Sequence, residues 1–150
     1  HAPVAVIGLD APVGPVGSIV VGYDGSVNAG RAATWALDFA ADHATVSIID
    51  ALALAPWLSA ERVRERFPDE VAEVEREFAE HMAELDPSDR ATKAIVIADA
   101  RLALAAAAQH SDLLVLGARG RGRIGSALLG STTTWLLQGP ARATVVVPSR

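Results

Sequence analysis

The chain has 150 residues, 51% of them hydrophobic and 21% charged, and its formal net charge is −5. This length fits one domain, and an acidic surface argues against nucleic acid or an anionic membrane as a partner. Without cysteine there can be no disulfide framework, thiolate nucleophile or cysteine-based metal site, and we expect a cytoplasmic location. No apolar run approaches the roughly 18 residues that a membrane-spanning helix needs.

Residues 1–17 form an extension ahead of a regular alternation of strands and helices. Within it, His1–Ile7 is similar in sequence to the closing segment, Ala141–Val147. We expect the extension to be an extra edge strand or the remnant of a preceding domain, although two short segments rich in valine and alanine can also match by chance. The main domain is expected to span residues 18–150.

The main domain begins with a strand and a helix. Ser18–Tyr23 is rich in β-branched residues and stops at an Asp-Gly-Ser turn signal at positions 24–26. Apolar residues then recur at helical spacing, which predicts a helix capped by Ser26 or Asn28. Thr45–Ala51 predicts the second strand.

The middle of the chain carries charged helices. Ser59–Arg66 predicts a short helix, and a longer one follows Pro68. The longer helix has apolar residues on one stripe and glutamates on the other face, which is most simply a solvated surface. The stripe consists of Val71, Val74, Phe78, Met82 and Leu85. Thr92–Ile97 then predicts the third strand, and Arg101–His110 predicts an alanine-rich helix.

The last third of the chain completes the alternation. Asp112–Gly117 predicts a fourth strand, and its four consecutive apolar residues indicate burial on both faces, as in the centre of a parallel sheet. A helix is expected from about Ser131 and a closing strand at Thr144–Val147. This order predicts an α/β fold, a doubly wound, Rossmann-like open parallel sheet with helices on both faces.

A glycine-rich segment between the fourth strand and the next helix carries the chemistry. It runs from Gly117 to Ser131, along the edge of the sheet where ligands bind in such folds. Glycines let backbone N–H groups approach a phosphate, and a helix that starts at Ser131 points unpaired N–H groups at an anion. Arg119, Arg121 and Arg123 make the segment basic. A glycine loop with solvated arginines is the alternative interpretation.

Two other phosphate-binding motifs are excluded. Gly120–Gly125 spells G-x-G-x-x-G, but no acidic residue follows about 20 residues later at a strand end, as a dinucleotide-binding unit requires. The chain also lacks G-x-x-x-x-G-K-[ST], so it is not a P-loop NTPase.

The spacing of Gly117, Gly120 and Gly130-Ser131 resembles the G-x2-G-x9-G-[S/T] signature of ATP-binding universal stress proteins. The resemblance extends to three strands: the first strand with its Asp24 turn, the fourth strand and the closing strand. It therefore covers about residues 18–148. The chain departs from the family at residues 98–101, where a Gly-x-Pro turn is common.

The resemblance implies a five-stranded sheet in the order 3-2-1-4-5, with a nucleotide between strands 1 and 4. Asp24 would bind the ribose with Gly117 beside it, and the backbone at Ala51 would contact adenine. The phosphates would lie against Gly120, Gly130, Ser131 and Thr132. A carboxylate suits a ribose hydroxyl but repels phosphate; alternatively, Asp24 forms an Asx turn or caps the helix.

We therefore expect an ATP-binding, stress-response regulatory protein rather than an enzyme. The sequence offers no catalytic residues and no metal site, so any Mg²⁺ would be held mainly by phosphates. A nucleotide-free dimerisation module of a tandem stress protein and a slow ATPase are the alternatives. Enzymes of the wider adenine-nucleotide α-hydrolase-like group carry His-x-Gly-His or Ser-Gly-Gly-x-Asp-Ser, and neither motif occurs here.

The closing strand is expected to lie at the edge of the sheet. An uncovered edge promotes association, and the resemblance implies a homodimer through Thr144–Val147 of two subunits. Pro3–Ile7 is similar to a closing strand and could compete for the same edge.

Overall fold

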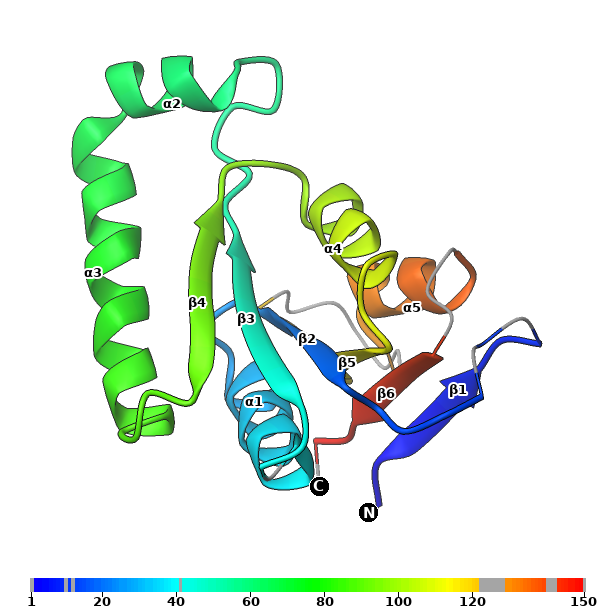
Figure 1. Cartoon of the computed structure of the whole chain (residues 1–150). Helices are drawn as coiled ribbons and strands as arrows, with labels where there is room; N and C mark the ends of the chain where they lie inside the picture. The colour runs from blue at the N-terminus through cyan, green and yellow to red at the C-terminus, as the bar shows by residue number, and fades with distance from the viewer. Residues whose placement is uncertain are drawn as a thin grey trace.

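The computed structural model describes residues 2–9, 11, 13–40, 42–121, 129–139 and 143–149. Within them, one sheet carries helices against both of its faces (Figure 1). The strands are β1 (Val4–Ile7), β2 (Ser18–Tyr23), β3 (Thr45–Ala51), β4 (Ala91–Val96), β5 (Leu113–Gly117) and β6 (Ala143–Val147). The helices are α1 (Val27–Ala40), α2 (Ala60–Arg66), α3 (Pro68–Leu85), α4 (Ala100–Ala108) and α5 (Ser131–Leu137).

The sheet confirms the expected strand order and corrects the expected strand number. Its order is β1-β6-β5-β2-β3-β4, and the five strands from β6 to β4 are parallel to one another. Those five strands have the expected order 3-2-1-4-5. The sheet nevertheless has six strands, because β1 adds to β6 in antiparallel orientation. The extension thus contains an extra edge strand.

The same pairing corrects the expected position of the closing strand. β6 lies between β5 and β1, so it is not at the edge of the sheet. Val4 pairs with Val146 and Ile7 with Ala143, which occupies the backbone groups of β6 that a partner subunit was expected to use. All four residues of β1 are exposed. The edge of the sheet on this side is therefore β1, and the opposite edge is β4.

β5 begins one residue later than expected, and Asp112, just before it, joins it to the start of β2. Its carboxylate accepts hydrogen bonds from the backbone N–H groups of Gly17 and Ser18, both at 2.9 Å, and from the Ser18 hydroxyl at 3.0 Å. This side chain therefore joins the starts of two neighbouring strands. The expected boundaries of β4 and α4 differ from the observed ones by one or two residues, and β2 and β3 have the expected boundaries.

The core has one layer on each side of the sheet. Alternate residues of β2, β3, β5 and β6 pack against α1 and α3, and the small alanines of α1 allow close approach. The other faces of β2 and β5 pack against α4 and α5. β5 is buried along Leu113–Leu116, as its apolar run predicts. Among the described residues, no helix is both long and apolar enough to cross a membrane.

The order of the strands fixes where a ligand can bind. The chain moves from β2 through α1 to β3, on one side of β2, and later returns to β5 on the other side. The connections that leave β2 and β5 diverge at this point, and they open a crevice at the carboxyl ends of both strands. Asp24 and the glycine-rich segment both follow these strand ends.

Candidate functional site

The turn after β2 holds Asp24 in place. Its Oδ1 accepts a hydrogen bond from the Ser26 backbone N–H at 3.0 Å, which is an Asx turn. Its Oδ2 accepts one from the Arg121 backbone N–H at 2.9 Å. The alternative that Asp24 forms an Asx turn is therefore correct. Each carboxylate oxygen keeps a second lone pair, so binding of a ribose by Asp24 stays a prediction.

Only one of the two candidate caps closes the start of α1. The Ser26 hydroxyl accepts a hydrogen bond from the Ala29 backbone N–H at 3.1 Å, so Ser26 is the cap. Asn28 does not cap the helix. Its Nδ2 donates to the Arg119 carbonyl oxygen at 3.1 Å, and this bond joins α1 to the glycine-rich segment.

Two of the signature glycines lie where a side chain would collide with the protein. A Cβ atom at Gly117 would be 2.8 Å from the Asn28 backbone carbonyl carbon, and one at Gly120 would be 2.2 Å from Asp24 Oδ2. Gly130 differs, because a Cβ atom there would be 3.6 Å from its nearest neighbours, an ordinary contact. Gly117 is thus required by packing against backbone, a side chain at Gly120 would displace the Asp24 carboxylate, and packing does not explain Gly130.

The segment returns to the strand ends at α5. The Gly130 backbone N–H donates to the Ala118 carbonyl oxygen at 2.8 Å, and the Thr133 hydroxyl donates to that of Gly117 at 3.0 Å. No side chain caps α5 among the described residues. The middle of the segment, residues 122–128 with Arg123, lies outside the described residues.

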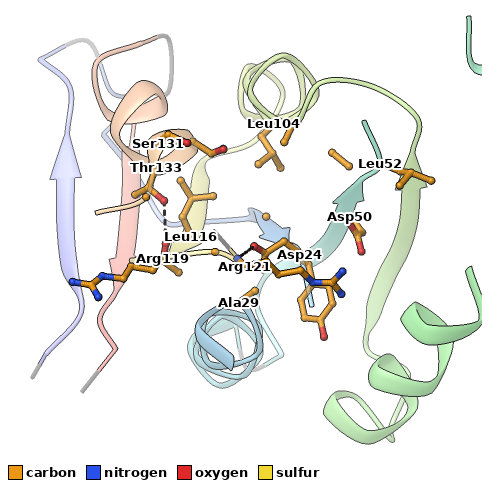
Figure 2. Close-up of a pocket in the computed structure, with 18 of the residues that line it drawn as sticks. Asp24, Ala29, Asp50, Leu52, Leu104, Leu116, Arg119, Arg121, Ser131 and Thr133 are labelled. Atoms are coloured by element: carbon orange, nitrogen blue, oxygen red, sulfur yellow. Dashed lines mark hydrogen bonds between the residues drawn. The ribbon is translucent and has the colours of Figure 1, made fainter. Parts of the chain in front are cut away.

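A cavity of about 590 Å³ opens between these elements, within the usual size range of small-molecule sites. Figure 2 shows Ser131 and Thr133 on one side of it and Asp50 on the opposite side. All seven residues that the sequence singles out line this one cavity. They are Asp24, Ala51, Gly117, Gly120, Gly130, Ser131 and Thr132. The fold therefore brings them together, and their individual contacts with a ligand stay predictions.

Sequence reasoning missed several residues that line the cavity. Asp50 is the last residue but one of β3, and Leu52 follows that strand. Val74 comes from α3 and Leu104 from α4. A carboxylate near the carboxyl end of a predicted parallel strand could have identified Asp50. The apolar residues could not be identified in this way, because they are indistinguishable in sequence from core residues.

Asp50 is a half-buried carboxylate at the β3 side of the cavity. Burial raises its pKa to about 6, and the nearby Arg121 guanidinium acts in the opposite direction. Tyr23, the partner of Asp50 in the strand pairing, also has a raised pKa, chiefly because of burial and then because of Asp50. The Tyr23 ring meets Phe78 edge-on, with centroids 5.7 Å apart. This end of the cavity thus combines an acidic group with the Tyr23 ring, which packs on Phe78 outside the cavity lining.

The described residues contain no cluster of three histidine, aspartate or glutamate side chains that could hold a metal ion.

Comparison with known proteins identifies the family and the fold. The model of the universal stress protein family matches residues 16–148. The universal stress protein UspA from Lactobacillus plantarum is 20% identical, with a TM-score of 0.72, over 89% of this chain and 99% of that one. The hypothetical protein MJ0577 is 18% identical, with a TM-score of 0.74, over 90% and 97% of the two chains.

A third similar structure contains a ligand. It is a universal stress protein in complex with cAMP, 24% identical with a TM-score of 0.67, and the match covers 90% of this chain and 99% of that one. No curated protein sequence matches the chain. At these identities the structural matches establish the fold alone.

Proposed function

The chain belongs to the universal stress protein family, and we propose that it is a regulatory protein that binds an adenine nucleotide, ATP foremost, in the cavity at the ends of β2, β3 and β5. One observation carries the proposal: the residues at the family's nucleotide-binding spacing all line that cavity. A similar protein that binds cAMP, an adenine nucleotide, supports the same ligand class.

Gly130 supplies the most direct support for phosphate binding. The protein itself leaves room for a side chain there, so a glycine is not needed for packing. A phosphate that approaches the backbone at this position would explain why the residue is glycine. Gly120 and Ser131 line the same part of the cavity. We assign the phosphates to this end, and any Mg²⁺ would be held mainly by them.

The cavity favours a binding role over catalysis. Its described lining includes Arg119 and Arg121 but no lysine and no histidine, so it lacks the phosphate-binding lysine of P-loop NTPases and kinases and the commonest general base. We therefore expect ATP hydrolysis slower than about one turnover per minute, far below the usual enzymatic range. Nucleotide occupancy would act by changing the shape or the partners of the protein, and a cytoplasmic location remains the expectation.

Titration calorimetry with ATP tests the proposal, and mass spectrometry of gently denatured protein would identify a co-purified ligand. Gly130→Val should lower ATP affinity at least tenfold, about 1.4 kcal/mol, because it fills the phosphate position. Gly30→Ala is the control, since Gly30 lies in α1 outside the cavity lining. Equal ATP affinity of Gly130→Val and the parent would refute this assignment. Failure of ATP, ADP and inorganic triphosphate to bind the parent would favour the nucleotide-free dimerisation module instead.

The pairing of β1 with β6 bears on assembly. When residues 1–7 are aligned in sequence with residues 141–147, Ala5 corresponds to Val145, and the same two residues pair in the sheet. In that alignment Val4 corresponds to Thr144 and Val6 to Val146, but in the sheet Val4 pairs with Val146 and Val6 with Thr144. β1 thus has the register that β6 of a second domain would have across a two-fold axis. We propose that the homodimer through Thr144–Val147 forms when β1 leaves this edge.

A further inference from the structure

The two sides of the cavity differ in their chemistry. Gly130 and Ser131 lie on one side, where the proposed function places phosphates. Asp50 lies on the opposite side, as Figure 2 shows, near Leu52 from the same strand end. A carboxylate repels phosphate, so the Asp50 side of the cavity suits the uncharged part of a nucleotide.

The sheet also sets the order in which a ligand meets these groups. β5, β2 and β3 are consecutive neighbours, and adjacent strands lie about 4.8 Å apart. The signature glycines follow β5, Asp24 follows β2, and Asp50 is near the end of β3. A nucleotide runs from phosphate through ribose to base. If its phosphates lie after β5 and its ribose at Asp24, its base reaches β3.

We propose that Asp50 is a specificity-determining residue that accepts a hydrogen bond from the exocyclic amino group of the base. The inference rests on the proposed nucleotide function and goes beyond it, because the family resemblance gives the backbone at Ala51 as a contact of adenine but no side chain that recognises the base. A carboxylate can only accept hydrogen bonds, so it pairs with an amino group. A base without a donor at that position would leave a half-buried carboxylate unpaired, which costs about 1–3 kcal/mol.

The apolar neighbours of Asp50 fit a base ring. Leu52, which follows β3, lines the cavity together with Val74 from α3 and Leu104 from α4. Nucleotide and other ligand sites combine such apolar walls with a few polar groups that fix orientation. Asp24 is already held by two backbone N–H groups, whereas the hydrogen bonds found among the described residues include none to the Asp50 carboxylate.

The charge of Asp50 should make base recognition depend on pH. The charged and titratable groups near its carboxylate are Tyr23 and Asp24 at the end of β2, His81 of α3 and Arg121 of the glycine-rich segment. Burial raises the pKa of Asp50 to about 6. Above that pH the charged carboxylate is the stronger acceptor, so the preference for an amino-bearing base should weaken as the pH falls through about 6.

The test compares ATP with purine riboside triphosphate, which lacks the amino group, by titration calorimetry. The parent should prefer ATP by about tenfold, and Asp50→Ala should reduce that preference to within about twofold. Asp50→Asn, which is nearly isosteric and keeps an oxygen, should give an intermediate preference. Asp38→Asn removes the same charge from an exposed site on α1 and should behave as the parent.

Inorganic triphosphate separates this inference from the proposed function. Its affinity should change less than about twofold in Asp50→Asn. If ATP and triphosphate bind but Asp50→Ala keeps the parent's preference for the amino group, Asp50 does not read the base and this inference is wrong. A loss in Asp50→Ala that disappears with 2′-deoxy-ATP would assign Asp50 to the ribose and overturn it as well. If neither ligand binds the parent, the proposed function itself fails.

Discussion

Replacing Asp24 separates a structural role from a ligand-binding role, because its carboxylate holds the backbone and also lines the cavity. Asp24→Ala removes the acceptors of the Ser26 and Arg121 N–H groups. Hydrogen bonds to charged groups contribute about 1.5–3 kcal/mol, and less where water can replace the acceptor. Both donors here are partly hydrated, so we expect about 1 kcal/mol for each. The free energy of unfolding should fall by about 2 kcal/mol, which lowers Tm by about 4–8 °C.

Ligand binding distinguishes the two roles further. If Asp24 also accepts a ribose hydroxyl, Asp24→Ala should weaken ATP and ADP about tenfold while inorganic triphosphate binds nearly as before. Asp24→Asn is the sharper variant, since its amide oxygen can still accept from one backbone N–H and should retain about half of the lost stability. Calorimetry and urea unfolding measure both quantities, with Asp38→Asn as the charge control. Triphosphate weakened as much as ATP would mean that Asp24 serves only the fold.

Three further outcomes follow from the structure. Gly117→Ala should destabilise the protein by about 1–3 kcal/mol in urea unfolding, because its Cβ would lie 2.8 Å from the backbone of α1. Gly30→Ala, inside α1, should instead stabilise it by about 0.5–1 kcal/mol. The opposite ranking of the two variants would contradict the packing argument. Hydrogen bonds, first from the Gly17 N–H, lower the pKa of Asp112, so its contribution to stability is present above about pH 4 and is lost as the pH falls through the folded pKa. The stability difference between the parent and Asp112→Asn should shrink in acid, and a difference independent of pH would exclude this role. Ala5→Pro removes a backbone donor from β1 and should raise the dimer fraction in sedimentation without changing ATP affinity; a dilution-independent monomer would argue against assembly through β6.

Much of the fold follows from local sequence patterns. β2 and β3 have the boundaries that their β-branched runs predict, and the apolar run of β5 indicates its central, doubly buried position. These features depend on side-chain periodicity along a few residues, which a sequence displays directly. The bonds of Asp112 differ in this respect, since they join residues more than 90 positions apart in the chain.

The candidate site divides in the same way. The glycine spacing and the Asp24 turn mark five of the residues that line one cavity, because each belongs to a short motif after a strand end, and the family resemblance adds Ala51 and Thr132. Asp50 carries no such motif. Its burial and its proximity to Arg121 arise from elements that lie about 70 residues apart in the chain and meet only in the folded sheet.

The sequence by itself determined the alternation of strands and helices, the order of the five parallel strands through the family resemblance, and the glycine spacing of the site. Only the tertiary structure decided which segment covers the edge of β6. The similarity of residues 1–7 to the closing strand allowed either partner, and backbone hydrogen bonds form with whichever strand the fold brings to that edge. Likewise, the charge of Asp50 became informative only in the cavity, where partial burial removes water from the carboxylate and raises its pKa.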